Sequence, residues 1–257
     1  MKSYSIIIPV YNEEKLLQPQ VERIISGIDT SLPQSVFELI LAENGSTDRT
    51  AEIASKLASK DKRIKVIRIN QPSYGLAFKE GLRKAKNPVV FQFDIDFWDI
   101  GFIKRSLIKL DSCEFVVGSK NLNGSKDLRP VKRRIVSRLM EKAINLRFPV
   151  SISDTHGLKA IKKEMVDRYL DRVVCQNHFF DSELLIRIAL DGHPWQEIPV
   201  SLKELRGSRF PFLVRSREVI REFFTLLSLD LKPEVVKLPY AFRIQKAMVQ
   251  YLVQLFM

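Results

Sequence analysis

The chain has 257 residues, of which 45% are apolar, so it can bury a sizeable core in one large domain or two small ones. This composition excludes disordered, collagen-like and low-complexity proteins. Lysine and arginine number 42 against 30 acidic residues, which gives a formal net charge of +12. A chain this basic is expected to bind an acidic partner: nucleic acid, a phosphorylated ligand or an anionic membrane surface.

Cysteine content and hydropathy indicate the cellular compartment of the protein. Cys113 and Cys175 are too few for a disulfide framework or a four-thiolate zinc site, and they predict two buried thiols in a reducing compartment. The apolar run at 5–10 is too short for a signal peptide, and no stretch of roughly 18 uncharged apolar residues predicts a transmembrane helix. We therefore expect a cytoplasmic protein, either soluble or peripheral at the cytoplasmic face of a membrane.

The first half of the chain alternates buried strands with amphipathic helices. Strands are predicted at 5–10, 37–42, 64–69 and 89–93, and helices at 13–28 and 75–85. A further helix follows the second strand, with Ser46 or Thr47 as its N-cap. Strands separated by helices predict parallel pairing in a doubly wound α/β sheet, and nearly continuous apolar strands agree with burial on both faces.

The second half is less regular. It predicts strands at 114–118, 157–161 and 196–202, a long basic helix at 130–147, and helices at 180–190 and 214–229. The simplest organisation is one mixed α/β domain over 1–210, followed by a C-terminal amphipathic helical appendage over 211–257.

Polar residues follow three of the predicted strands, at the edge where open α/β sheets bind ligands. The clusters are Tyr11-Asn12-Glu13-Glu14 after the first strand, Glu43-Asn44-Gly45-Ser46-Thr47-Asp48 after the second, and Asp94-Ile95-Asp96 after the fourth. In an extended strand end, residues i and i+2 point the same way, so Asp94 and Asp96 could together hold Mg²⁺ or Mn²⁺ with diphosphate oxygens. Such a metal would neutralise charge on a leaving diphosphate.

Several segments resemble a known family. SIIIPVYNEE (5–14), ENGSTDRT (43–50), GLAFKEGLRKA (75–85) and FQFDIDF (91–97), in this order and spacing, resemble the family 2 glycosyltransferases of the GT-A fold. VVGSK (116–120), RRIVSR (133–138), SDTHGLKAIKKE (153–164), FFDSELLIRIALDGHPWQEIPV (179–200) and GSRF (207–210) are similar to the dolichyl- or polyprenyl-phosphate sugar synthase branch. The resemblance implies an inverting hexosyltransferase that moves a sugar from a nucleoside diphosphate sugar to a lipid-linked phosphate.

The resemblance also implies roles for individual residues. On the donor side, it assigns Pro9, Tyr11 and Glu13 to the nucleoside pocket, Glu43 and Asn44 to the base or ribose, and Asp94 and Asp96 to the metal and diphosphate. On the acceptor side, it assigns Lys120, Arg134 and Ser137 to the acceptor phosphate. It also assigns Arg209 to the donor phosphates, once a C-terminal loop closes. Asp96, Lys120 and Arg134 are the expected catalytic residues.

The chain departs from the family pattern at four positions. Glu43-Asn44 replaces the usual pair of aspartates, which leaves one carboxylate for the nucleotide. Tyr74 stands where a lysine or glycine often precedes Gly75. Trp98 occupies a place where some members supply a further metal ligand, and an indole N–H cannot ligate a metal.

The positive charge is concentrated in one segment. Residues 119–147 hold nine lysines and arginines against two acidic residues, a local net charge of +7. Anionic head groups attract such segments by about 1 kcal/mol per basic residue, so a lipid-phosphate site at a membrane surface explains this cluster best. The 214–229 helix fits an interfacial helix and a core helix equally well, and 241–257 could lie on the membrane or bind a membrane partner subunit.

Other functions stay open at this point. Transfer to a saccharide hydroxyl would require a general base, for which Asp154 is the candidate. A degenerate transferase-like module would bind nucleotide without turnover. Nucleic acid is not an expected partner, because the chain has no ribonucleoprotein, helix-turn-helix or zinc-finger signature.

Overall fold

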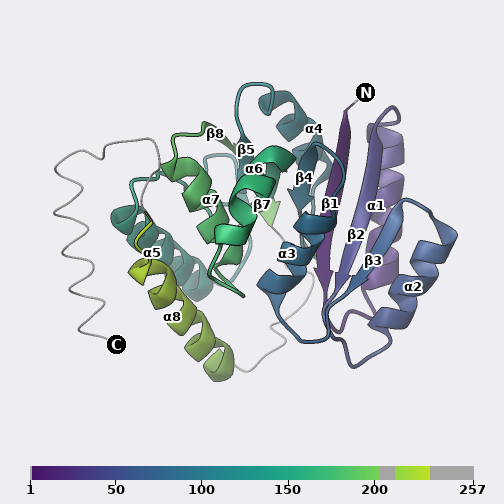
Figure 1. Cartoon of the computed structure of the whole chain (residues 1–257), viewed down its shortest axis with the longest axis horizontal. Helices are drawn as coiled ribbons and strands as arrows, with labels where there is room; N and C mark the ends of the chain where they lie inside the picture. Colours follow the sequence, from purple (N-terminus) through teal and green to yellow (C-terminus); the bar gives the residue numbers. More distant parts are fainter. Residues whose placement is uncertain (1, 203–211, 232–257) are drawn as a thin grey trace.

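The computed structural model describes residues 2–202 and 212–231, and for residues 202 and 212–216 it describes the backbone alone. In these ranges helices cover both faces of a central sheet (Figure 1). Its strands are β1 (Ser3–Val10), β2 (Val36–Glu43), β3 (Ile64–Arg68), β4 (Val89–Gln92), β5 (Phe115–Ser119), β7 (Leu158–Lys162) and β8 (Trp195–Pro199). The short strands β6 (Lys126–Asp127) and β9 (Ser201–Leu202) form a separate pair.

Up to β5 the helices alternate with the strands along the chain, and beyond β5 the order is less regular. They are α1 (Leu17–Ser31), α2 (Thr50–Lys60), α3 (Tyr74–Lys84), α4 (Ile100–Lys109), α5 (Val131–Arg147), α6 (Lys163–Tyr169), the 3₁₀ turn η1 (Leu170–Arg172), α7 (Phe180–Leu190) and α8 (Phe212–Ser228). The predicted doubly wound α/β architecture is therefore confirmed.

The strand order in the main sheet is β3-β2-β1-β4-β7-β5-β8. Every neighbouring pair is parallel except those of β7, which runs antiparallel to β4 and to β5. Gly157 leads into β7, and a Cβ atom there would lie 1.9 Å from the carbonyl oxygen of Gly118 at the end of β5. Only glycine tolerates this approach, which lets the reversed strand enter the sheet beside β5.

Successive strand residues point to opposite faces, so the sheet separates two hydrophobic cores. On one face, Ile6 and Ile8 pack with α1, α2 and α4. On the other, Ile7 packs with α3, α5, α6, α7 and α8. Both cysteines are buried and unpaired, as predicted.

Several helix boundaries differ from the predictions. Helix α1 begins at Leu17 rather than at residue 13, because the preceding residues bond to the loop after β2. Neither Ser46 nor Thr47 caps α2, which begins at Thr50 with no side-chain N-cap, so that prediction is wrong. Helices α4 and α6 were not predicted.

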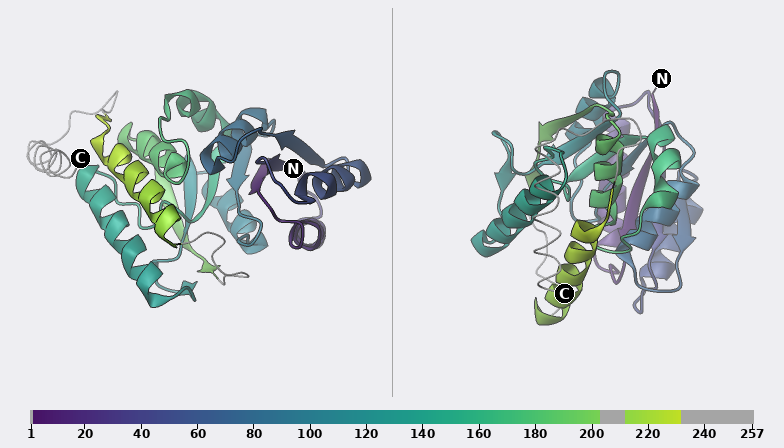
Figure 2. Two further views of the ribbon diagram at one scale, coloured as in Figure 1. Left: turned by 90° about the horizontal axis from the view of Figure 1, so that it is seen from below. Right: turned by 60° about the vertical axis from the view of Figure 1, so that its left-hand side comes forward.

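Helices α5 and α8 lie side by side at one end of the molecule (Figure 2). Buried Arg147 of α5 donates from Nε to the carbonyl oxygen of Leu227, at 2.8 Å, and from Nη2 to that of Leu229, at 2.7 Å. Leu226 and Leu227 belong to the same core as the sheet. Helix α8 is thus packed on the α/β domain, while the predicted boundary at residue 210 stays a prediction and 241–257 lies outside the described residues.

Within the described ranges, no helix combines the length and the apolar character needed to cross a bilayer.

Candidate active site

Three strand ends meet at one edge of the sheet. Strand β1 lies between β2 and β4, and Val10 at its end is in register with Glu43 at the end of β2. On the other side, the N–H of Phe93 donates to the carbonyl oxygen of Ile7 at 3.0 Å. The polar clusters after these strands therefore converge, as their order in the sequence predicts.

The loops that follow β1 and β2 are bonded to each other. Asn12, whose φ is +51°, donates from its N–H to Ser46 Oγ at 3.0 Å and accepts from the N–H of Thr47 at 2.8 Å. The N–H of Glu13 donates to Thr50 Oγ1 at 2.6 Å. Sequence reasoning placed Asn12 and Ser46 in the converging polar clusters without giving either a role, and it missed Thr50.

The predicted nucleotide-binding residues lie in this framework. Glu13, Glu43 and Asn44 are buried. Glu43 Oε1 accepts from the N–H of Ser46 at 2.6 Å, and Asn44 Oδ1 accepts from the N–H of Ser73 at 2.8 Å. Two of the three side chains thus shape the loops around the strand ends. Pro9 lies in β1 and the half-buried Tyr11 follows it.

Asp94 and Asp96 occupy a tight turn rather than an extended strand end. The N–H of Phe97 donates to the carbonyl oxygen of Asp94 at 3.0 Å, and the N–H of Asp94 donates back at 3.2 Å. The strand-end geometry expected for this pair is therefore wrong, because the chain turns directly after β4 and buries Ile95. The carboxylates remain close neighbours: burial and the negative charge of Asp96 raise the pKa of Asp94.

The acidic turn offers two carboxylates to a divalent cation. In the described part of the chain, no group of three or more acidic, histidine or cysteine side chains has the spacing of a metal site. Two neighbouring carboxylates fit a hard cation that takes its other ligands from diphosphate and water. Trp98 supplies no ligand, since its Nε1–H donates to Gln20 Oε1 at 3.1 Å.

Lys120 forms a buried ion pair with Asp154. The distance from Nζ to Oδ2 is 2.7 Å, and the N–H of Lys120 donates to the same oxygen at 2.9 Å. Burial by itself would raise the pKa of Asp154, but the charge and hydrogen bonds of Lys120 lower it. Nζ of Lys120 also lies 5.5 Å from the ring centroid of Phe97, which places the pair beside the acidic turn.

Helix α5 carries the other predicted acceptor residues. Nε of Arg134 is buried and has no hydrogen-bond partner among the described residues. Ser137 Oγ accepts from Nη1 of Arg129 at 3.4 Å, and Arg129 is paired with Asp127, with Nη2 2.8 Å from Oδ2. Arg209 lies outside the described residues.

A second buried ion pair lies close to the acidic turn and was not predicted. Nζ of Lys159 is 2.5 Å from Oδ2 of Asp181 at the start of α7. Both charges act on Asp94, since the cation lowers and the anion raises its pKa. The sequence gives no direct signal for this pair, because its members lie on separate elements.

Glu183 and Arg187 form an ion pair on α7, with Nη2 2.6 Å from Oε1. The carboxylate of Glu183 is fully buried and also accepts from the N–H groups of Val174 and Cys175. It therefore fixes the loop before α7.

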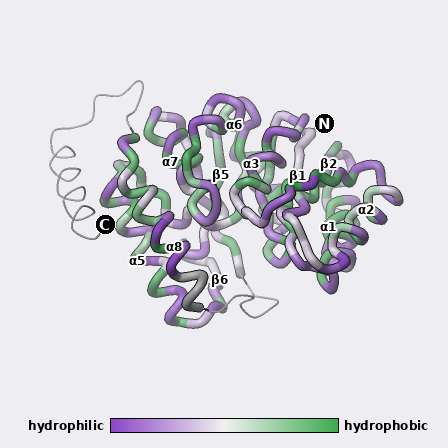
Figure 3. The backbone as a smooth tube through the Cα atoms, turned by 60° about the horizontal axis from the view of Figure 1, so that its bottom comes forward, coloured by the Kyte–Doolittle hydropathy of each residue, from purple (hydrophilic) through white to green (hydrophobic). Residues whose placement is uncertain are grey.

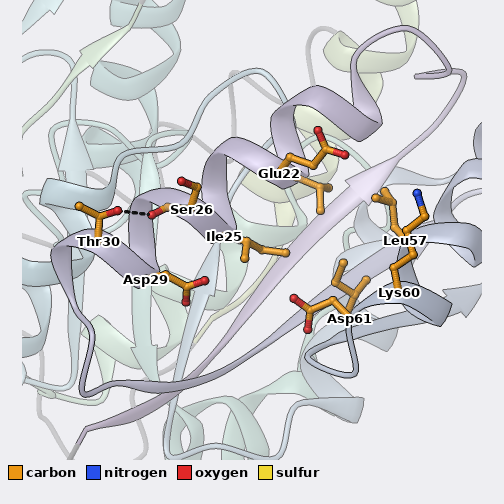
Figure 4. A pocket seen from close by; sticks show the side chains of 10 residues that line it. Glu22, Ile25, Ser26, Asp29, Thr30, Leu57, Lys60 and Asp61 are labelled. Atoms are coloured by element: carbon orange, nitrogen blue, oxygen red, sulfur yellow. Dashed lines mark hydrogen bonds between the residues drawn. The ribbon is translucent and has the colours of Figure 1, made fainter.

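A hollow of about 370 Å³ lies elsewhere, between α1 and α2. Glu22, Asp29, Lys60 and Asp61 line it with apolar residues of the two helices (Figure 4). None of the predicted site residues lines it, so it is not part of the candidate site.

A mostly parallel α/β sheet with an acidic turn at its edge is the arrangement expected of a GT-A glycosyltransferase. The model of the Glycosyl transferase family 2 matches residues 5–170, and the chain belongs to this family.

Three glycosyltransferases are similar in sequence to this chain. The chain is 29% identical to the glycosyltransferase AglD of Haloferax volcanii over 216 residues, covering 82% of this chain and 34% of that protein. It is 27% identical to the dolichyl-phosphate beta-glucosyltransferase ALG5D of Trichomonas vaginalis, covering 80% of this chain and 67% of that protein. It is 29% identical to the dolichol-phosphate mannosyltransferase of Pyrococcus furiosus, covering 63% of this chain and 47% of that protein. The chain thus spans about a third of AglD.

Solved structures agree on the fold. Glucosyl-3-phosphoglycerate synthase from Mycobacterium tuberculosis, in complex with Mn²⁺, UDP and phosphoglyceric acid, has a TM-score of 0.64 at 19% identity, covering 89% of this chain and 79% of that chain. The mannosyltransferase PcManGT from Pyrobaculum calidifontis, in complex with GDP-Man and Mn²⁺, has a TM-score of 0.63 at 20% identity, covering 97% of this chain and 69% of that chain. The expected GT-A fold is confirmed.

Proposed function

We propose that this protein transfers a sugar from a nucleoside diphosphate sugar to a polyprenyl, dolichyl-type phosphate, with inversion, at a membrane surface. The observation that carries the proposal is helix α5, where Arg134 lies among exposed apolar and basic side chains, on the segment that follows the acidic turn and Lys120. A phosphate on a lipid requires this combination of a cation and an apolar surface. The names of ALG5D and the Pyrococcus furiosus enzyme supply the same acceptor class.

The donor would bind at the ends of β1, β2 and β4. Pro9, Tyr11, Glu13, Glu43 and Asn44 would surround the nucleoside, because they share this edge of the sheet. Asp94 and Asp96 would hold Mg²⁺ or Mn²⁺, as two carboxylates beside a diphosphate suit a hard cation. When bound, the cation would stabilise negative charge on the departing nucleoside diphosphate.

The acceptor phosphate would bind between the acidic turn and α5. Lys120, Arg134 and Ser137 are its proposed ligands, and Arg209 would contact the donor phosphates. Asp154 partly neutralises Lys120, so the guanidinium of Arg134 would supply much of the attraction for the phosphate. Guanidinium groups suit phosphate because their N–H groups match its oxygens in pairs.

Catalysis would rest on position and charge. A phosphate monoester is already anionic near neutral pH, so its oxygen needs no strong general base to attack the sugar. Asp96, Lys120 and Arg134 would hold the two phosphates so that this oxygen faces the anomeric carbon. Asp154 is a weak base, because its ion pair with Lys120 lowers its pKa. This argues against the alternative in which a saccharide hydroxyl is the acceptor.

The membrane surface would lie against α5. Val131, Ile135 and Leu139 repeat at a spacing of four residues and are 52–63% exposed, so they form an apolar stripe on the helix. Lysines and arginines flank this stripe, and Figure 3 shows hydrophilic and hydrophobic residues alternating along the helix. Such a face suits an anionic bilayer surface, which we propose to be a cytoplasmic one. A membrane partner subunit stays a further proposal.

Release of nucleoside diphosphate tests the function. The protein is incubated with UDP-, GDP- and dTDP-sugars, a short polyprenyl phosphate in detergent, and Mn²⁺ or Mg²⁺. We expect release only when one nucleotide sugar and the lipid phosphate are both present, and loss of release in Asp96→Asn. Release with a soluble glycan instead would select the hydroxyl acceptor, and nucleotide-induced thermal stabilisation without turnover would select the degenerate module.

A further inference from the structure

Tyr74, at the start of α3, donates a hydrogen bond to the acidic turn. Its hydroxyl lies 2.8 Å from Oδ1 of Asp94. A phenol hydroxyl donates one hydrogen bond and a carboxylate oxygen accepts, so Tyr74 is the donor in this contact. This contact joins two residues that are 20 positions apart and belong to different elements.

The start of α3 is held from three directions, which fixes the tyrosine. Ser73 caps the helix, with Oγ accepting from the N–H of Leu76, and its N–H is bonded to Asn44 Oδ1. Ser73 Oγ also lies 2.8 Å from the carbonyl oxygen of Gln176. A Cβ atom at Gly75 would lie 2.3 Å from this same oxygen, so only glycine lets α3 approach the loop so closely.

The loop at 174–179 that receives Ser73 is itself fixed by a carboxylate of α8. Glu222 is buried and accepts from the backbone N–H groups of Gln176 and Asn177, at 3.0 and 2.7 Å, and from that of His178, at 2.6 Å. The loop cannot shift without breaking these bonds. Tyr74 therefore approaches Asp94 from a rigid support.

The phenol ring is fixed as well as its backbone. It packs edge-to-face on Phe78 one helical turn later, with ring centroids 4.9 Å apart. Ring packing therefore fixes the position of the hydroxyl, and the hydroxyl bonds Oδ1 of Asp94. Oδ2 of Asp94 has no hydrogen-bond partner among the described residues, so it remains available to a ligand.

From this geometry we infer that Tyr74 is a positioning residue, which occupies Oδ1 of Asp94 and thereby presents Oδ2 to the divalent cation of the donor diphosphate. The inference rests on the proposed function and adds a residue that the family resemblance left without a role. A partner that orients a ligating carboxylate typically changes metal affinity ten- to a hundredfold.

The test measures metal binding directly. Mn²⁺ is titrated into the full-length protein, alone and with inorganic pyrophosphate, and the electron paramagnetic resonance signal of free aqueous Mn²⁺ gives the dissociation constant. We expect Tyr74→Phe, which keeps the ring and removes the hydroxyl, to weaken Mn²⁺ binding by about tenfold. The metal concentration needed for half-maximal turnover should rise in parallel, while the melting temperature should stay close to that of the wild type.

Tyr169→Phe is the matched control. It removes another tyrosine–carboxylate bond, from the hydroxyl at the end of α6 to Oδ2 of Asp191, the residue after α7, at 2.6 Å. We expect wild-type Mn²⁺ affinity from this variant, and loss of binding from Asp96→Asn.

Two failures are distinguishable. Equal Mn²⁺ affinity in Tyr74→Phe and the wild type, with loss in Asp96→Asn, would overturn the role of Tyr74 and leave the metal site standing. Absence of Mn²⁺ binding in the wild type, with and without pyrophosphate, would overturn both the metal part of the proposed function and the inference built on it.

Discussion

Lys120 and Asp154 form an ion pair that is almost completely removed from solvent, each with a side-chain exposure of 4%. The two residues are 34 positions apart, on the loop after β5 and on the segment that leads into β7. The antiparallel position of β7 beside β5 brings them together. A residue expected to bind phosphate is therefore also a structural cation, and its two roles can be separated by experiment.

Removing the charge of Lys120 should destabilise the protein. Lys120→Met leaves Asp154 buried without its partner, a change that costs about 3–5 kcal/mol in proteins. The free energy of unfolding in urea measures it. The double variant Lys120→Met with Asp154→Leu should recover most of the stability, because it leaves no isolated charge. Equal stability of Lys120→Met and the wild type would contradict the buried pair.

Arg134 should act on the acceptor and not on the donor. Removal of its guanidinium in Arg134→Ala should raise the KM for polyprenyl phosphate by about tenfold, the effect of losing a hydrogen bond to a charged group. The KM for the nucleotide sugar should change little. Arg138→Ala, which removes an exposed cation from the same helix, is the control. Equal changes in both KM values for Arg134→Ala would speak against an acceptor site on α5.

The apolar stripe of α5 should bind membranes without supporting the fold. The double variant Ile135→Gln with Leu139→Gln should bind anionic vesicles roughly tenfold more weakly, since it removes two side chains that would enter the bilayer surface. Its unfolding free energy should match that of the wild type. Co-sedimentation with vesicles of phosphatidylcholine and phosphatidylserine measures the binding.

Ile108→Gln is the control for the stripe, because Ile108 is 65% exposed but lies on α4, on the opposite face of the sheet. It should bind vesicles as the wild type does. Equal losses in the two variants would show that general hydrophobicity, and not α5, drives membrane binding.

His156 should give the protein a pH-dependent stability. The His156 side chain is 41% exposed, and its Nδ1 lies 3.5 Å from Oε1 of Glu141. Partial desolvation would lower its pKa, but Glu141 and Asp181 raise the pKa overall. Because the pKa is higher in the folded state, protonated His156 stabilises the fold. This stabilisation is complete below the unfolded-state pKa of about 6.5, and it is lost as the pH rises through the folded-state pKa. Urea midpoints between pH 5.5 and 8.5 should fall more steeply in the wild type than in His156→Gln. Identical slopes would contradict the pairing with Glu141.

Much of the architecture could be predicted, because the spacing of apolar residues along the chain indicates where helices and strands form. The helix predicted at 180–190 coincides with α7, and the buried run at 5–10 lies within β1. Helix α4 was not predicted, although Phe102, Ile103 and Leu107 give it an apolar face. No side chain caps its first turn, so the sequence has no clear signal for where the helix begins. The antiparallel direction of β7 depends on the path of the chain around α5, which no local pattern specifies.

The site was predictable only in its residue types. Positions 94 and 96 could be found from their chemistry and their place after a strand, but the turn that Phe97 closes was not foreseen. The contacts that define the surroundings of these carboxylates join residues far apart in the chain, such as Tyr74 to Asp94 and Lys159 to Asp181. Pairing of this kind follows from the sheet order and requires the folded structure.

The cap that Glu222 places on the loop before α7 has a consequence for the order of assembly during synthesis. Until α8 has left the ribosome, the N–H groups of Gln176, Asn177 and His178 lack their carboxylate, and the support of α3 is incomplete. The acidic turn would therefore acquire its final geometry late in translation, after most of the sheet has formed. A nascent transferase would hold the metal of its donor more weakly until the helix next to its proposed membrane face is in place.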